Sequence, residues 1–160
     1  MMQKIYYAIK RVILSILIRW CHMFSGTTKY LIDANAIRSM SVGMIKSKLG
    51  TDRIIATIPD VKHEVLSLTR KLDLIHIDAL ADDVYIKARE IINRESVKNV
   101  IDYYNYKGAA DVMLLAHALT VGGVGIFKDE VIIVTNDVNL RLACDDLGVL
   151  WKSMEYFRDI

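Results

Sequence analysis

Short apolar segments alternate with longer amphipathic ones along most of the chain, and this alternation limits the possible folds more than any other feature. Four segments have the length and apolar character of buried strands: 29–33, 53–58, 72–77 and 131–135. Helical patterns occupy about 35–48, 60–71, 79–93, 96–105, 109–120 and 138–147, and 149–151 has the character of a final edge strand. Because this alternation favours parallel strand pairing, we expect an α/β protein with three α/β/α layers and a mostly parallel central sheet of four to five strands.

The length of the chain and its charge distribution predict one domain and a leader. The 160 residues are enough for one domain and too few for two ordinary ones. Residues 1–30 carry five lysines and arginines and no acid, whereas the remaining 130 residues carry 16 basic and 19 acidic side chains. No internal repeat or Ser/Pro-rich linker divides this body. We therefore expect a basic leader over 1–26 and one domain over 27–160.

The leader has the pattern of an N-terminal amphipathic helix. One helical face collects Ile5, Ile9, Val12, Ile13, Ile16, Trp20 and Met23. Basic residues interrupt the apolar run, so the leader lacks the roughly 18–20 uncharged residues of a membrane-spanning helix. Residues 4–24 could contact a membrane surface or a partner, pack on the domain itself, or precede a true start at Met23. With two cysteines and no signal-peptide pattern, we expect a cytoplasmic protein.

Four acidic residues occupy positions that suggest a binding site. Asp33 and Asp137 stand at the carboxyl ends of two predicted strands, where ligands bind in open parallel sheets. Glu64 borders the apolar face of its helix, and Asp111 projects on the same side as apolar neighbours. Each acid alone has an ordinary role as a helix cap, a helix-dipole partner or a surface residue. Together they predict a cluster of carboxylates, among which no lysine or arginine is clearly placed.

Four segments of the sequence carry a family resemblance. They are Y-L-I-D-A-N-A-I (30–37), I-P-D-V-K-H-E-V-L (58–66), G-A-A-D-V-M-L-L-A-H-A-L (108–119) and V-I-I-V-T-N-D-V-N-L-R-L-A-C-D-D-L-G-V (131–149). In this order they resemble the motifs of the PIN-domain nucleases, over nearly everything from Lys29 to Tyr156. The chain departs from the family pattern at Ala34, where a hydroxyl is often found, and at Asn139, where some members carry a further acid that would strengthen a second metal position.

The resemblance implies a PIN-like fold and a metal-dependent endoribonuclease, the toxin of a toxin–antitoxin pair of the VapC kind. Asp33, Glu64, Asp111 and Asp137 would be the metal-binding and catalytic acids, with Asn35 and Thr135 as supporting polar residues. The cofactor would be Mg²⁺ or Mn²⁺, ions that carboxylate oxygens suit. The expected partners are an RNA substrate, a small antitoxin protein and a second copy of the chain in a homodimer.

Other functions are compatible with the same residues. One is a housekeeping RNA-processing nuclease that uses the leader as a localising helix. Another is a degenerate PIN domain that only binds RNA or protein. A phospho-acceptor signalling domain also clusters acids at strand ends, but it requires an aspartate after a middle strand and a lysine after a late one. Ile58–Pro59 and Thr135–Asn136 stand at those points, so we set that class aside.

Overall fold

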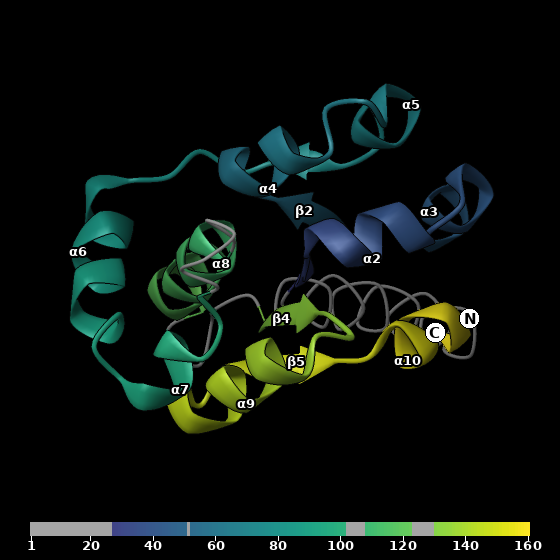
Figure 1. Ribbon diagram of the computed structural model, residues 1–160. Coiled ribbons are helices and arrows are strands. Elements are labelled where there is room, and N and C mark those ends of the chain that lie inside the picture. Colours follow the sequence, from purple (N-terminus) through teal and green to yellow (C-terminus); the bar gives the residue numbers. More distant parts are fainter. Residues whose placement is uncertain (1–26, 51, 102–107, 123–129) are drawn as a thin grey trace, which may run out of the picture.

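The computed structural model describes the chain except for residues 1–26, 51, 102–107 and 123–129 (Figure 1). The predicted leader helix therefore lies outside the described residues, as does part of the helix predicted over 96–105. Within the described part of the chain, no helix has the length and apolar character needed to span a membrane.

A five-stranded parallel sheet forms the centre of the fold (Figure 1). Its strands are β1 (Thr28–Ile32), β2 (Arg53–Thr57), β3 (His76–Ile77), β4 (Glu130–Val134) and β5 (Leu150–Lys152), in the order β3-β2-β1-β4-β5. Every pairing is parallel, with Tyr30 of β1 opposite Ile55 of β2 and Ile132 of β4. The predicted α/β class and its central parallel sheet are confirmed.

Helices flank this sheet (Figure 1). They are α2 (Ala34–Ser39), α3 (Val42–Lys48), α4 (Pro59–Glu64), α5 (Thr69–Leu72), α6 (Asp82–Ile91), α7 (Glu95–Lys98), α8 (Ala109–Val121), α9 (Val138–Leu147) and α10 (Met154–Asp159). The long helix α8 packs against α4, α6 and β4, and α7 packs against α9. The α10 helix was not among the expected elements. Its N-terminus is capped by Ser153, whose hydroxyl accepts from the backbone N–H of Tyr156.

Two helices expected to be continuous are each divided in two. The pattern over 35–48 is interrupted at buried Met40, whose extended backbone ends α2 before the Ser41 hydroxyl caps α3. The pattern over 60–71 is interrupted after Glu64, and the chain resumes as the single turn α5. Because α5 extends to Leu72, the strand predicted over 72–77 is shortened to the two residues of β3. The helical spacing of apolar residues continues across both breaks, so the sequence pattern does not indicate where the helices end.

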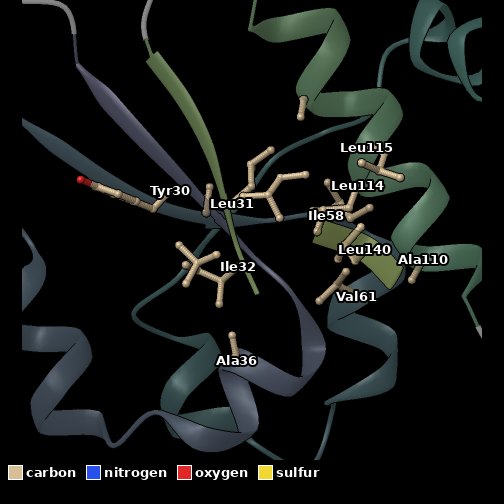
Figure 2. Close-up of a cluster of buried hydrophobic side chains, with 14 of the residues drawn as sticks. Tyr30, Leu31, Ile32, Ala36, Ile58, Val61, Ala110, Leu114, Leu115 and Leu140 are labelled. Atoms are coloured by element: carbon tan, nitrogen blue, oxygen red, sulfur yellow. The ribbon is translucent and has the colours of Figure 1, made fainter. Parts of the chain in front are cut away.

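The buried core includes side chains of β1, β4, α4, α8 and α9. Figure 2 shows part of it, with labelled side chains from β1, α2, α4, α8 and α9 gathered together. Leu31 and Ile32 of β1 are fully buried, as are Leu114 and Leu115 of α8. Burial of each such side chain stabilises the fold by about 1.5–3 kcal/mol. Buried side chains therefore hold β1 and β4 in place, and the carboxyl ends of both strands lie at the same edge of the sheet.

A polar network is also buried in the domain. The Asp78 carboxylate, directly after β3, accepts a hydrogen bond from Lys29 Nζ at 2.9 Å and lies 2.8 Å from His117 Nε2. The Asp78 side chain is 7% exposed, and His117 of α8 is buried beside it. Because a carboxylate only accepts, the short contact places the His117 proton on Nε2. The network ties β1 and α8 to the segment that follows the edge strand.

We predict that Asp78→Asn destabilises the protein at neutral pH. Burial alone would raise the pKa of Asp78, but hydrogen bonds from His117 and Lys29 and their charges outweigh it and hold the pKa below its usual value. The carboxylate therefore stabilises the fold above the unfolded pKa of about 3.9, and this contribution is lost as the pH falls further. We expect a loss of about 1.5–3 kcal/mol in the free energy of unfolding at pH 7, the range for hydrogen bonds to a charged group. Urea unfolding at several pH values measures it.

The matched control is Asp73→Asn, because Asp73 is exposed and lies shortly before β3, the strand that Asp78 follows. It should change the stability by less than about 0.5 kcal/mol. Equal stabilities for the two variants at pH 7 would contradict the structural role given to Asp78.

Candidate functional site

The pairing of β1 with β4 brings two of the predicted site residues to the same edge of the sheet. Ile32 is the register partner of Val134, so Asp33 and Thr135 emerge side by side. The Thr135 hydroxyl donates to Asp33 Oδ2 and accepts from the backbone N–H of Asp137 at 3.0 Å. Thr135 thus links the ends of two strands that are about a hundred residues apart in the chain.

Asp33 and Asp137 are both helix caps. Asp33 Oδ1 accepts from the backbone N–H of Ala36 at the start of α2, and Asp137 Oδ1 accepts from that of Leu140 at 2.9 Å at the start of α9. The cap holds each carboxylate in a fixed orientation. A carboxylate offers about four lone-pair positions, of which the cap occupies one. Capping is therefore compatible with a further role as a ligand.

Asp111 lies in the first turn of α8, near enough to the other three acids for their charges to act on it. Burial raises the pKa of its carboxyl to about 7, and the charges of Asp33, Glu64 and Asp137 add to the effect. The helix is brought to this point by Gly108, whose φ of 91° suits glycine. A Cβ at Gly108 would lie 2.3 Å from the backbone oxygen of Val100, so only glycine fits there.

Asp33 is the most deeply buried of the four acids, with 2% of its surface exposed. Burial raises the pKa of its carboxyl, and the nearby Asp137 charge acts in the same direction. Hydrogen bonds from Thr135 and the Ala36 backbone oppose this rise, and so does the Arg38 charge. The hydrogen bonds thus offset only part of the cost of burying the charged Asp33 carboxylate. A nearby cation would stabilise its charged form further.

Arg38 is a member of the site that the sequence did not indicate. Its Nη2 donates to the backbone oxygen of Glu64 at 3.0 Å and lies 4.0 Å from Glu64 Oε2, and its Nη1 donates to Asn35 Oδ1 at 3.0 Å. The expectation of a site without a clearly placed basic residue is corrected. Asn35 is exposed, and the hydrogen bond that its side-chain oxygen accepts comes from Arg38.

The four acids suit a hydrated cation better than a closed metal cage. Among the residues that the structure describes, no three His, Cys, Asp or Glu side chains form a group that could by itself hold an ion. Mg²⁺ usually retains several waters and is bound through one or two carboxylates, and Mn²⁺ also prefers oxygen ligands. The oxygen donors fit a divalent ion of this kind, and so does Asp111, whose pKa is raised by burial and further by the charges of the other three acids.

Comparison with known proteins identifies the fold. No protein-family model and no curated protein sequence matches this chain. Among solved structures, VapBC-1 from nontypeable Haemophilus influenzae is similar, with a TM-score of 0.52 and 10% sequence identity over 80% of this chain and 99% of the matched chain. The two proteins share a fold. The PIN-like α/β/α architecture expected from the sequence is supported by this likeness, which at such low identity concerns the fold alone.

We predict that Asp111→Asn stabilises the metal-free protein at alkaline pH. Because folding raises the pKa of Asp111 to about 7, the folded state binds more protons than the unfolded state between about pH 4 and 7. The stability of the parent therefore falls as the pH rises through this range. A neutral isostere removes the penalty, and one pKa unit corresponds to about 1.4 kcal/mol. We expect a gain of roughly 2–4 kcal/mol at pH 8 in EDTA, measured by urea unfolding.

The control is Asp83→Asn, because Asp83 also stands in the first turn of a helix but is exposed. This variant should show no comparable gain, and the advantage of Asp111→Asn should disappear near pH 4. A destabilised Asp111→Asn at pH 8 in EDTA would show that the acids do not repel one another as described.

Proposed function

We propose that this chain is an endoribonuclease that hydrolyses RNA phosphodiester bonds with Mg²⁺ or Mn²⁺. The observation that carries the proposal is the hydrogen-bonded link from Asp33 through Thr135 to Asp137 at the ends of β1 and β4. Asp111 supports it, because burial raises the pKa of its carboxyl to about 7 and the charges of Asp33, Glu64 and Asp137 add to the effect. These acids come from four separate parts of the chain, and Asp33 and Asp137 follow β1 and β4 at the carboxyl edge of the sheet. Ligands bind at this edge in open parallel sheets.

Burial and hydrogen bonding suggest different roles among the four acids. Asp33 and Asp137, linked by Thr135, are the proposed direct ligands, and Asp111 is a third ligand or holds a coordinated water. A bound divalent ion would polarise the phosphodiester and lower the pKa of a water. Glu64 is 43% exposed and thus accessible to substrate and solvent. We assign it as an outer ligand or as the group that accepts the proton of the attacking water.

The proposal extends to the toxin of a toxin–antitoxin pair, with a homodimer and a small antitoxin as partners. Its support is the resemblance of the four sequence motifs to PIN-domain nucleases of the VapC kind, together with the fold shared with VapBC-1. A housekeeping RNA-processing nuclease uses the same chemistry. A short neighbouring gene upstream with a DNA-binding pattern would favour the toxin.

A degenerate domain that only binds RNA or protein is the non-enzymatic alternative. Such a domain has no need to keep four mutually repelling carboxylates, since their burial costs stability. The presence of Asp33, Glu64 and Asp137 near enough for their charges to act on Asp111 therefore supports catalysis over binding alone.

We predict that the purified chain cleaves RNA in a reaction that stops with EDTA and resumes when Mg²⁺ or Mn²⁺ is added. Attack by an activated water rather than by the ribose 2′-hydroxyl should leave a 5′-phosphate and a 3′-hydroxyl. End-group analysis of fragments from a mixed pool of structured and single-stranded RNA provides the measurement. Products with 2′,3′-cyclic ends, or cleavage that resists the chelator, would overturn the proposal.

We further predict that Asp137→Asn separates metal binding from helix capping. Asn retains some capping ability and relieves part of the repulsion, so the variant should melt no lower than the parent in EDTA. Mg²⁺ at ten times its dissociation constant should stabilise the parent by about 1.4 kcal/mol and the variant much less. Cleavage should fall by orders of magnitude. Thermal melts with and without Mg²⁺ test the binding independently of any substrate.

A suitable comparison is Ser41→Ala, which removes the cap of α3 without touching an acid. It should lower the melting temperature, because loss of a cap costs about 1 kcal/mol, while keeping the Mg²⁺ response and the activity. If Mg²⁺ shifts the parent and Asp137→Asn equally, Asp137 is only a cap.

A further inference from the structure

We propose that Arg38 binds a backbone phosphate of the RNA beside the acidic site. The inference rests on the proposed nuclease function, which it deepens by naming the residue that recognises the substrate's charge. It starts from the position of the Arg38 guanidinium, which is held between α2 and the end of α4 at the border of the carboxylate cluster.

Two acceptors fix the orientation of this guanidinium. Nη1 donates to Asn35 Oδ1 on the same helix, and Nη2 donates to the backbone oxygen of Glu64, each at 3.0 Å. These acceptors are neutral, so they orient the arginine without cancelling its charge. A guanidinium has five N–H donors, and these two bonds leave others for a ligand. Such a planar group is well matched to the oxygens of a phosphate.

The backbone below Arg38 is held in place as well. Lys71 Nζ donates to the backbone oxygens of Ile37 at 2.9 Å and Arg38 at 2.8 Å, and so satisfies carbonyl groups at the end of α2. An arginine held at its backbone and at its head group loses less conformational freedom when a ligand binds. The site is thus organised before any phosphate arrives.

The remaining charge of Arg38 is available to an incoming anion. Its side chain is 48% exposed, and its ion pair with Glu64 Oε2 is long, at 4.0 Å, and partly solvated. Exposed pairs of this kind contribute little to stability, so a phosphate can compete with Glu64 for the guanidinium.

The acidic cluster makes such a cation necessary. A phosphodiester that approaches Asp33, Glu64, Asp111 and Asp137 meets like charge, and repulsion of this type opposes binding. Within the part of the chain that the structure describes, the Arg38 charge lowers the pKa of Asp33, whereas the charges acting on Asp111 come from acids. Together with a bound divalent ion, Arg38 would offset this repulsion on the side of the site formed by α2 and α4.

The test measures RNA binding in an Asp137→Asn background, in which cleavage is suppressed. A short fluorescein-labelled single-stranded RNA is titrated with the protein in Mg²⁺, between about 50 and 200 mM salt. Arg38→Gln should weaken binding severalfold and reduce the slope of log K against log salt by about 0.7, the value for one phosphate contact on a single strand. Arg38→Lys should keep most of the slope, since it keeps the charge. Arg89→Gln, at an exposed position on α6, removes the same charge elsewhere and should change neither quantity.

Two results would overturn the inference. In one, Arg38→Gln binds with the affinity and slope of Arg89→Gln. In the other, Arg38→Gln alone slows cleavage, while Arg38→Gln combined with Asp137→Asn binds RNA as tightly as Asp137→Asn does. Arg38 would then only position Glu64. The proposed nuclease function is tested by a different result: it is wrong if the native chain cleaves no RNA. Even then, the binding measurement decides whether Arg38 contacts phosphate. Thermal melts of the variants confirm that each is folded.

Discussion

The parallel pairing of β1 with β4 is the constraint on which the site depends. Five register pairs, from Thr28 opposite Glu130 to Ile32 opposite Val134, join two parts of the chain that are about a hundred residues apart. Both strands end in consecutive buried residues, so their side chains pack on both faces of the sheet and a shift of register would disturb both. This register sets Thr135 beside Asp33 and allows one hydroxyl to connect both carboxylate-bearing segments.

The core that fixes this register also makes the acids costly to keep charged. Asp33 is buried and receives hydrogen bonds from Thr135 and the Ala36 backbone, so part of its desolvation is offset. Asp111 is held near three other acids, and its pKa of about 7 expresses the remaining cost. A divalent cation would convert the same repulsion into binding energy. Under the proposed function, the stability lost in the metal-free protein would be offset by affinity for a cation, a common compromise at functional sites.

The sequence could select the four acids as candidates because their positions depend on local patterns. Asp33 directly follows β1, Asp137 comes shortly after β4 as the cap of α9, and Asp111 stands in the first turn of a long apolar helix. Arg38 was missed because its contact with Glu64 spans 26 residues and depends on how two six-residue helices approach each other. Helices this short are stabilised by tertiary packing, which leaves little trace in hydrophobic spacing.

The sequence by itself determined the α/β class and the parallel sheet and indicated the candidate acids, because apolar runs and carboxylates are properties of short segments. Tertiary structure decided where α2 and α4 end and how short β3 becomes, since apolar spacing continues across those breaks. It also decided that Asp78, which no sequence pattern singled out, would join Lys29 and His117 inside the domain. The physical reason is that each of these contacts links residues far apart in the chain, and their burial and pKa values exist only once the surrounding elements have packed.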